Sequence, residues 1–404
     1  MTNLKDARRA SDSPPSTGKP KHVAIIVGLG FSPVTEMLRG IADYVQEHDP
    51  WAIYLKQYGS EAPPNWFRDW QGDGIMVYSP RVRDEELREC RVPIVDLAGH
   101  LNTKGIPLVC LHNEAIGRVG AEHLLDRGFK HFAFYDNIEF EWSRGRREAF
   151  VAALKARGLP CAIYSTRLQI NHIGAAQGWE KQQQELAQWL KDSLPKPAGV
   201  MASSDLMGQN LLEACLLAGI SVPEEIAVLG VDNDETICRI ASPPMSSVMA
   251  NHVARGYVAA EVLDHLMQGK PGPTEAVLIE PAGIAPRAST DMMAIEDPDV
   301  VRALQVIRER AYTNVGINDI VGSIAVSRTV LQRRFRKLVG RSIHEEIIRL
   351  RLNRAIELLH DTTLEIKAIA RKSGFKSQAY MTAVFQQRLG RTPGSYRTHV
   401  KSLA

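Results

Sequence analysis

Short apolar runs alternate with amphipathic stretches from residue 22 to about residue 285. The apolar runs are HVAIIVG, WAIYLKQY, GIMVYS, VPIVDLAG, IPLVCLHN, HFAFYDN, CAIYS, AGVMASS and IAVLGVDN, separated by helical stretches such as VTEMLRGIADYVQEH and DLMGQNLLEACLLAG. Continuous apolar strands separated by helices predict parallel sheets covered on both faces. One small sheet would not use so many strands. We therefore expect an α/β body of two lobes, with ligand chemistry at the carboxyl ends of the strands.

The pattern changes near residue 290, where the acidic and strand-poor connector RASTDMMAIEDPDV is followed by helical periodicity alone. The first residues, MTNLKDARRASDSPPSTGKPK, contain no hydrophobic run and predict a disordered segment. The predicted organisation is a disordered segment over 1–20, an α/β domain over 21–290, a linker over 291–300 and an all-α domain over 301–404.

The helical part contains an internal repeat with a period of 50 residues. SRTVLQRRFRKLVGRS and SQAYMTAVFQQRLGRT are its two copies. Each copy has a short apolar helix, a tight turn, a serine at a helix N-cap and a second helix with inward apolar residues at i, i+4 spacing. This arrangement predicts a helix-turn-helix in each copy. The intervening SIHEEIIRLRLNRAIELLH predicts a rigid helical strut that holds the two units.

The exposed positions of the two second helices carry side chains that can read base edges. Arginine can bind guanine and glutamine can bind adenine through paired hydrogen bonds, while threonine and alanine suit the methyl group of thymine. The candidate DNA-binding residues are Arg328, Thr329, Gln332 and Arg333 in the first copy and Gln378, Ala379 and Thr382 in the second. For either copy alone, an ordinary helical hairpin with a polar outer face is an equal alternative.

Charge separates the two parts of the chain. From residue 301 onward there are 20 Lys and Arg against 7 Asp and Glu, a net of +13, whereas the first 300 residues hold 29 against 39. A basic domain of this size is typical of nucleic-acid binders, because phosphate neutralisation supplies much of their affinity. A basic solvated surface remains the alternative on charge alone, although the duplication weakens it.

Other chemistry finds little support in the sequence. The five cysteines are scattered and show no metal-ligand spacing, so we expect a reducing cytoplasm and neither disulfides nor a metal site. The segment GLGFSP lacks the spacing of a phosphate-binding loop, and no Ser-His-Asp constellation stands at a nucleophile elbow. We expect no cofactor and no catalytic residues. No apolar run approaches the length of a membrane span.

The segment from 315 to 397 resembles the DNA-binding domain of the AraC/XylS family, which has two helix-turn-helix units. In the second copy, IARKSGF, the following Ser and Phe, GRTP and the closing YR stand in family order. The first copy departs from the pattern at Val321, where a small alanine is usual, and at Ala325, where the turn commonly has glycine.

Residues 20–290 resemble the periplasmic-binding-protein-like sensor domains of LacI/GalR regulators. The similarity lies in NEAIGRVGAEHLLDRGFKHFAF, SRGRREAF, SSDLMGQNLLEACLLAGISVPEEIAVLGVDND and IEPAGIAPRAST. The order of a sensor domain followed by an AraC-type DNA-binding domain resembles that of the regulators of xylose operons. By position, Arg146 and Asp232 match the residues that hold sugar hydroxyls in the sensor family. The segment GLGFSPVTEML departs from the xylose-regulator pattern, so another sugar or a non-sugar metabolite remains open.

A carboxylate and a guanidinium can clamp neighbouring hydroxyls through charge-assisted hydrogen bonds. The candidate ligand-binding residues are Arg146, Asp232, Trp142, Asn113, Phe31 and Ser32. Three of them have a structural alternative: Asp232 as a helix cap, Arg146 as part of a solvated helix start and Trp142 as packing.

These patterns predict a ligand-responsive, sequence-specific transcription regulator of sugar catabolism, and the resemblance favours activation. Its expected partners are promoter DNA, a small effector such as xylose and a second copy of the chain, with RNA polymerase a further candidate. One alternative is a sugar-processing α/β enzyme with a DNA-tethering helical tail. Another makes the tail a protein-interaction bundle.

Overall fold

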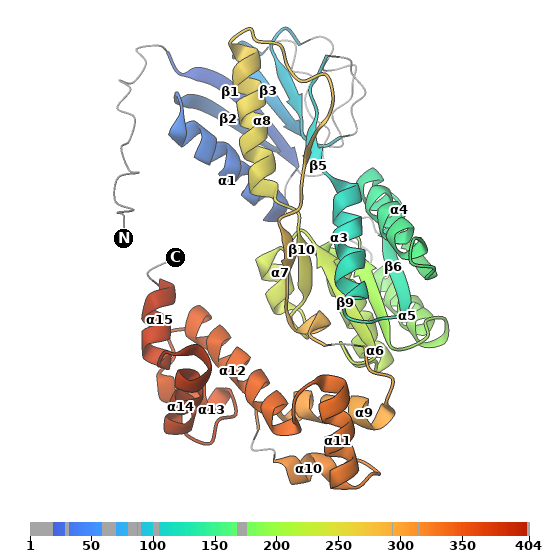
Figure 1. Cartoon of the computed structure of the whole chain (residues 1–404). Helices are drawn as coiled ribbons and strands as arrows, with labels where there is room; N and C mark the ends of the chain where they lie inside the picture. Colours follow the sequence, from blue (N-terminus) through green and yellow to red (C-terminus); the bar gives the residue numbers. More distant parts are fainter. Residues whose placement is uncertain are drawn as a thin grey trace, which may run out of the picture.

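The computed structural model describes residues 19–28, 32–58, 70–79, 87, 90–99, 105–167, 176–292, 294–313 and 316–401. Within these ranges, two α/β lobes are followed by a helical domain (Figure 1). The predicted fold class, a two-lobed α/β body with parallel sheets and an all-α C-terminal domain with two helix-turn-helix units, is confirmed. Most of the predicted disordered segment over 1–20 lies outside the described residues.

The first lobe is built on a parallel sheet. In spatial order its strands are β2 (Trp51–Tyr58), β1 (Lys21–Gly28), β3 (Gly74–Tyr78) and β4 (Ile94–Asp96). A short parallel pair, β5 (Val109–Leu111) and β11 (Val277–Ile279), lies beside β4 through a bridge between Asp96 and Leu108. Helices α1 (Ser32–Glu47) and α8 (His252–Met267) pack against each other at this sheet (Figure 1).

The second lobe contains a larger sheet whose described strands are parallel, with one exception. In spatial order the strands are β12 (Gly283–Ala285), β10 (Ser246–Met249), β9 (Ile226–Val231), β8 (Ala198–Ala202), β6 (His131–Asn137) and β7 (Cys161–Thr166). Strand β12 is the antiparallel one. The helices of this lobe are α3 (Asn113–Leu125), α4 (Glu141–Lys155), α5 (Ala176–Asp192), α6 (Asp205–Ala218) and α7 (Glu235–Ile240). The 3-10 helix η2 (Ala288–Thr290) ends the lobe.

The chain crosses between the lobes three times, after β5, after β10 and between β11 and β12. At these crossings the backbone N–H of His112 donates to Ile279 O at 2.9 Å, and that of Ala282 donates to Met249 O at 2.8 Å. The ring of His112 also contacts Glu280, with Nδ1 2.5 Å from Oε1. The three segments therefore lie side by side, which is the arrangement expected at a hinge.

The C-terminal domain is helical throughout its described residues. Its helices are α9 (Pro298–Arg310), α10 (Ile317–Val321), α11 (Arg328–Val339), α12 (Ile343–Asp361), α13 (Ile366–Lys372), α14 (Gln378–Leu389) and α15 (Pro393–Lys401). Helix α12 is the predicted strut: Ile347 belongs to a core around α9, α10 and α11, while Leu359 belongs to a core around α13 and α14. Figure 1 shows the first helix-turn-helix unit beside the second lobe.

The two copies of the repeat begin and end their second helices in the same way. Ser327 and Ser377 cap the N-termini by accepting a hydrogen bond from the backbone three residues later. Gly340 and Gly390 end the helices in the left-handed conformation, with φ of 77° and 67°. Four apolar side chains at i, i+4 spacing are fully buried, as the pattern predicted: Leu331, Phe335, Met381 and Phe385.

Two details differ from the sequence-based prediction. Helix α9 begins at Pro298, inside the predicted linker, because Asp297 caps it and Val300 is buried in the core of the helical domain. The second difference concerns strands β10, β11 and β12, which have three or four residues each and were not among the predicted strands.

Candidate functional site

Arg146 lies at the centre of a polar cluster between the lobes. Its guanidinium donates from Nε to Asn113 Oδ1 at 3.0 Å and from Nη1 to Ser203 O at 2.6 Å. Its Nη2 lies 3.5 Å from Asp232 Oδ1, and its Cζ lies 4.7 Å from the centre of the Trp142 ring. The residue is 3% exposed, so the alternative of a solvated helix start is excluded.

Asp232 follows strand β9 on a turn with unusual backbone angles. Its φ is 105° and that of Asn233 is 56°, a region that L-residues rarely occupy. The cap of the following helix is Asp234, which accepts from the backbone N–H groups of Thr236 and Ile237. Asp232 is therefore not the helix cap, and its carboxylate points to Arg146 and to His252, whose Nε2 is 3.2 Å away.

Electrostatics keep this carboxylate charged. Burial would raise the pKa of Asp232, but the Arg146 guanidinium and the hydrogen bond from His252 hold that pKa below its usual value. Burial lowers the pKa of both Arg146 and His252. The site therefore contains an anion and a cation in contact and shielded from solvent.

Two residues that the sequence analysis did not single out complete the cluster from the first lobe. His252 and Arg255 lie in the first turns of α8 and are 2% and 3% exposed. The Arg255 guanidinium stacks on the Tyr78 ring, with Cζ 4.6 Å from its centre. We call Arg146, Asp232, Asn113, His252 and Arg255 the interlobe cluster.

Several buried polar atoms of this region bond no other group in the described part of the chain. They are Nε and Nη2 of Arg255, Nδ1 of His252 and Oγ of Ser203. Buried donors and acceptors are nearly always satisfied in native proteins, by protein, water or ligand. These atoms are consequently the groups with which the cluster can bind a polar molecule.

The carboxyl group of Asp205 supports the Asp232 turn from behind. It accepts from Ser247 Oγ at 2.6 Å and from the backbone N–H of Asp234 at 2.7 Å. Burial, with the neighbouring Asp232 charge, raises the pKa of Asp205 well above its usual value. The turn thus presents the charged Asp232 carboxylate to the space between the lobes, while the Asp205 carboxyl group, which favours its neutral form, supports the turn from the opposite side.

Four of the six predicted ligand-binding residues meet in this place: Arg146, Asp232, Trp142 and Asn113. Ser32 is half-buried at the start of α1. One turn further, Glu36 has a raised pKa, caused first by burial and also by the charges of Asp232 and its acidic neighbours, against the opposing effect of Arg39. Phe31 lies outside the described residues.

The predicted DNA-binding residues lie on the outer faces of α11 and α14. Arg328, Thr329, Arg333, Gln378 and Ala379 are exposed, and Gln332 and Thr382 are half-buried. Arg328 Nη1 donates to Asn318 Oδ1 at 3.1 Å, and Thr382 Oγ1 donates to Gln378 O at 2.9 Å. On α14, Gln378, Ala379 and Thr382 line an open hollow on the surface together with Ala383 and Gln386.

A third arginine of the first copy, Arg334, forms ion pairs within the helical domain. Nη1 of Arg334 lies 3.4 Å from Asp297 and 3.2 Å from Asp299, both carboxylates at the start of α9. These two carboxylates of the acidic segment 287–300 thus neutralise part of the charge of the basic domain. Arg328 and Arg333 are left as the outward arginines at the start of α11.

The described residues contain no group of three or more His, Cys, Asp or Glu side chains arranged to hold a metal ion. None of the described helices combines the length and apolar character needed to span a membrane.

Comparisons with known proteins agree with both parts of the fold. Residues 121–290 match the periplasmic binding protein-like domain family, and residues 321–399 match a helix-turn-helix domain family. The xylose operon regulatory protein of Escherichia coli K12 is 30% identical over 374 residues, which are 90% of this chain and 93% of that protein. The xylose operon regulatory protein of Haemophilus influenzae is also 30% identical, over 90% of this chain and 94% of that protein.

The same likeness extends to three dimensions. A solved structure described as the xylose-binding transcription activator xylR superimposes with a TM-score of 0.79 at 27% identity, and covers 94% of this chain and 98% of that chain. Both parts of the fold and their order are therefore shared with these regulators.

Proposed function

The chain belongs to the family of the xylose operon regulatory proteins, and we propose that it is a transcription activator that responds to a small sugar such as xylose. As a family member it is a regulator of transcription that binds DNA, not an enzyme.

The observation that carries the sugar proposal is the buried contact between Arg146 and Asp232. A carboxylate accepts hydrogen bonds and a guanidinium donates them, so two neighbouring hydroxyls of a sugar can bind one to each. Within the described part of the chain, Arg255 and His252 add buried polar atoms without protein partners. A polyol such as xylose offers several hydroxyls, which matches this set of groups.

Trp142 and Tyr78 supply apolar surface beside these polar groups. Each ring already stacks on an arginine of the interlobe cluster, Trp142 on Arg146 and Tyr78 on Arg255. Aromatic faces pack well against the C–H faces of a ring-shaped ligand while leaving its hydroxyls to polar partners. We assign Arg146, Asp232, Asn113 and Trp142, with His252 and Arg255, to effector binding.

The DNA part of the proposal rests on the repeated helices α11 and α14 and on α12 between them. A rigid strut can hold two recognition helices in successive turns of the major groove, about 10 bp apart. We assign base reading to Arg328, Thr329, Gln332 and Arg333 in α11 and to Gln378, Ala379 and Thr382 in α14. A homodimer would place four such helices on paired half-sites, with RNA polymerase as a further partner. We place this activity in the cytoplasm, with the DNA it regulates.

The direct experiment is a thermal-shift screen of pentoses and hexoses on the full chain. A sugar present at about 100 times its dissociation constant should stabilise the folded state by roughly 3 kcal/mol. Stabilisation by xylose or a related sugar supports the proposal. If no sugar raises the unfolding temperature, the proposed effector class is wrong.

A second experiment addresses DNA binding. The affinity for a duplex selected from a random pool should fall steeply with salt, because each neutralised phosphate contributes about −0.9 to the slope of log K against log salt. A flat salt dependence would favour the protein-interaction bundle. When the same chain is incubated with the sugar that it binds, the sugar should remain chemically unchanged. Conversion of the sugar would support the alternative of a sugar-processing enzyme.

A further inference from the structure

The turn that carries Asp232 is bonded on its other side to the end of the sensor domain. Asn233 Oδ1 accepts a hydrogen bond from Arg287 Nη2 at 2.8 Å, and the backbone N–H of Asn233 donates to Ser247 Oγ at 2.9 Å. Because Asp232 and Asn233 both have positive φ, the turn keeps its shape only through such surrounding contacts. Asp232 is therefore linked to Arg287 through the next residue of the turn, Asn233.

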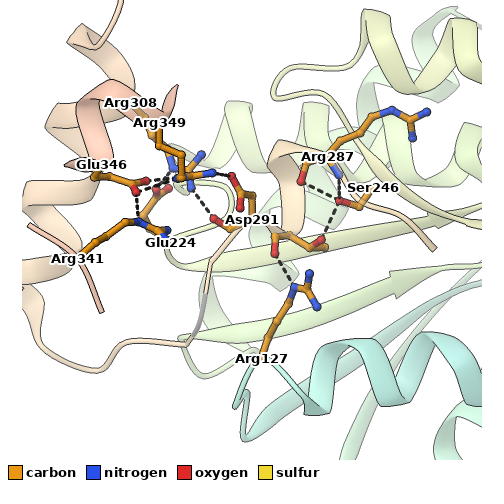
Figure 2. Close-up of polar contacts among 10 residues, drawn as sticks. Arg127, Glu224, Ser246, Arg287, Asp291, Arg308, Arg341, Glu346 and Arg349 are labelled. Carbon is orange, nitrogen blue, oxygen red and sulfur yellow. Dashed lines mark hydrogen bonds and ion pairs between the residues drawn. The ribbon is translucent and has the colours of Figure 1, made fainter. Parts of the chain in front are cut away.

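Arg287 is in turn fixed to the segment that leads out of the sensor. Its backbone N–H donates to Ser246 Oγ at 2.8 Å, and Ser246 Oγ donates to Arg287 O at 2.9 Å (Figure 2). Thr290 Oγ1 donates to the same Ser246 oxygen at 2.7 Å, and Thr290 O accepts from Arg127 Nε at 2.6 Å. These hydrogen bonds fix Arg287 and Thr290 to Ser246, the first residue of β10.

The next residue, Asp291, makes the contact with the helical domain. Its carboxylate pairs with Arg349 of α12, and its backbone oxygen accepts from Arg308 Nη2 of α9 at 3.0 Å (Figure 2). Arg308 also pairs with Glu224 of the second lobe, which is 2% exposed. Both helices that carry the first helix-turn-helix unit are thus bound to the sensor by buried or half-buried charges.

We propose that Arg287, Asp291 and Arg349 form a connector that transmits the state of the interlobe cluster to the first helix-turn-helix unit. The inference rests on the proposed function, since it concerns the response to an effector bound there. A ligand that moves the Asp232–Asn233 turn shifts Arg287 and residues 287–291, and Asp291 then moves α12 through Arg349. The residues of the connector are positioning residues, because they act through others on both DNA and effector.

Geometry favours this route over a purely covalent one. A flexible linker alone would leave the helical domain free to reorient, and effector binding would then have little influence on it. Here Gln305 Nε2 of α9 also donates to Ser221 Oγ of the second lobe at 2.6 Å, close to the Glu224 pair. The contacts of Asp291 and those of α9 with the second lobe together fix the first helix-turn-helix unit to this lobe. A small shift of residues 287–291 is therefore transmitted to the unit instead of being absorbed by a flexible linker.

The test uses the full chain, D-xylose and a duplex selected from a random pool. The quantity measured is the ratio of the DNA dissociation constants without and with saturating xylose. The variants are Arg287→Met and Arg349→Gln, which break the two ends of the connector. Arg354→Gln is the matched control, because it removes the same charge from α12 while its partner Glu357 lies on the same helix.

The wild-type ratio should lie in the range of about 5 to 150 that is usual for allosteric coupling. Arg354→Gln should keep this ratio, whereas both connector variants should bring it close to 1. Their separate affinities for xylose, and for DNA without xylose, should stay within about 3-fold of wild type. If either variant folds and keeps the wild-type ratio, the connector is refuted.

Other outcomes also decide the matter. Loss of xylose affinity in Arg287→Met would mean that Arg287 serves the binding site itself, which contradicts the connector. If Arg287→Met does not fold, Asn233→Gly removes the acceptor of the same hydrogen bond and suits the positive φ. A wild-type chain that binds xylose and DNA with a ratio of 1 refutes the connector alone, whereas a chain that binds no sugar refutes the proposed function as well.

Discussion

Arg146 Nη2 lies 3.5 Å from Asp232 Oδ1 although the two residues are 86 positions apart in the chain. The guanidinium comes from the first turns of α4, the helix after β6, and the carboxylate from the turn after β9. Strands β6 and β9 are parallel and lie on either side of β8, so both residues stand at the carboxyl edge of the same sheet. Their side chains are 4% and 15% exposed. This is the place where an open parallel sheet collects its ligand-binding groups.

Replacement of Asp232 by Asn should weaken xylose binding by about 10- to 100-fold. A hydrogen bond to a charged group contributes roughly 1.5–3 kcal/mol, and the amide removes the charge while it keeps the shape. Isothermal titration with D-xylose measures the change. The control is Asp234→Asn, the same substitution two residues later, where asparagine can still cap α7. Equal losses in both variants would contradict a specific role of Asp232.

Arg328→Ala and Gln378→Ala should each weaken specific DNA binding by about 1–3 kcal/mol and relax base preference at one position. We expect α11 to bind DNA more tightly than α14, because α11 presents the charged Arg328 and Arg333 whereas Gln378, Ala379 and Thr382 of α14 are uncharged. The loss should therefore be larger for Arg328→Ala than for Gln378→Ala. Selection from random duplexes with each variant measures the base preference. An unchanged preference would exclude that residue as a reader.

Gly374→Ala should destabilise the second helix-turn-helix unit more than Gly390→Ala does. Both glycines have positive φ, 77° and 67°, so both substitutions carry backbone strain of about 1–2 kcal/mol. At Gly374 a Cβ would also lie 2.6 Å from Ala311 O, whereas at Gly390 it would meet nothing within 4 Å. Denaturant unfolding followed by circular dichroism compares the two, and equal losses would contradict the predicted steric clash.

The stability of the chain should fall between pH 6.5 and 4 in part because of His123. Burial, assisted by Arg127, lowers the pKa of His123 to about 4. As the pH falls, His123 binds a proton near pH 6.5 in the unfolded chain but only near pH 4 in the folded chain. The contribution of neutral His123 to the free energy of unfolding is therefore complete above pH 6.5 and is lost as the pH falls to 4. This contribution is roughly 3 kcal/mol.

The variant His123→Gln tests this explanation. Its unfolding temperature should depend less on pH between 6.5 and 4 than that of the wild type, because the titrating group is gone. His123→Gln should also retain a partner for Thr290, whose Oγ1 lies 2.9 Å from Nε2 of His123. The same pH dependence in both proteins would assign the acid sensitivity to other groups.

Much of the fold could be predicted from the sequence because its strands are continuous apolar runs and its recognition helices are repeated. Strand β10 was missed because it reads SSVM, with two serines whose hydroxyls bond Arg287 O and Asp205. Strands β11 and β12 were missed because three residues give no periodicity. Such short strands are stabilised by neighbours that are distant in the sequence.

The site shows the same limit. Arg146 and Asp232 could be predicted because they match the sugar-binding positions of the sensor family, and Asn113 because it follows a predicted strand. His252 and Arg255 begin a helix in the other lobe, and their burial results from the crossing of the chain between lobes. Local sequence does not reveal that crossing, although two ionisable side chains next to the cap Asn251 were a signal that could have been followed.

The most direct test of the central claim is a titration of a selected duplex with the full chain, with and without D-xylose, followed by fluorescence anisotropy. If a sugar between the lobes controls the DNA-binding domain, saturating xylose should tighten DNA binding at least about 5-fold, and by linkage DNA should tighten xylose binding by the same factor. Identical DNA affinities with and without xylose, in a chain that demonstrably binds xylose, would contradict it.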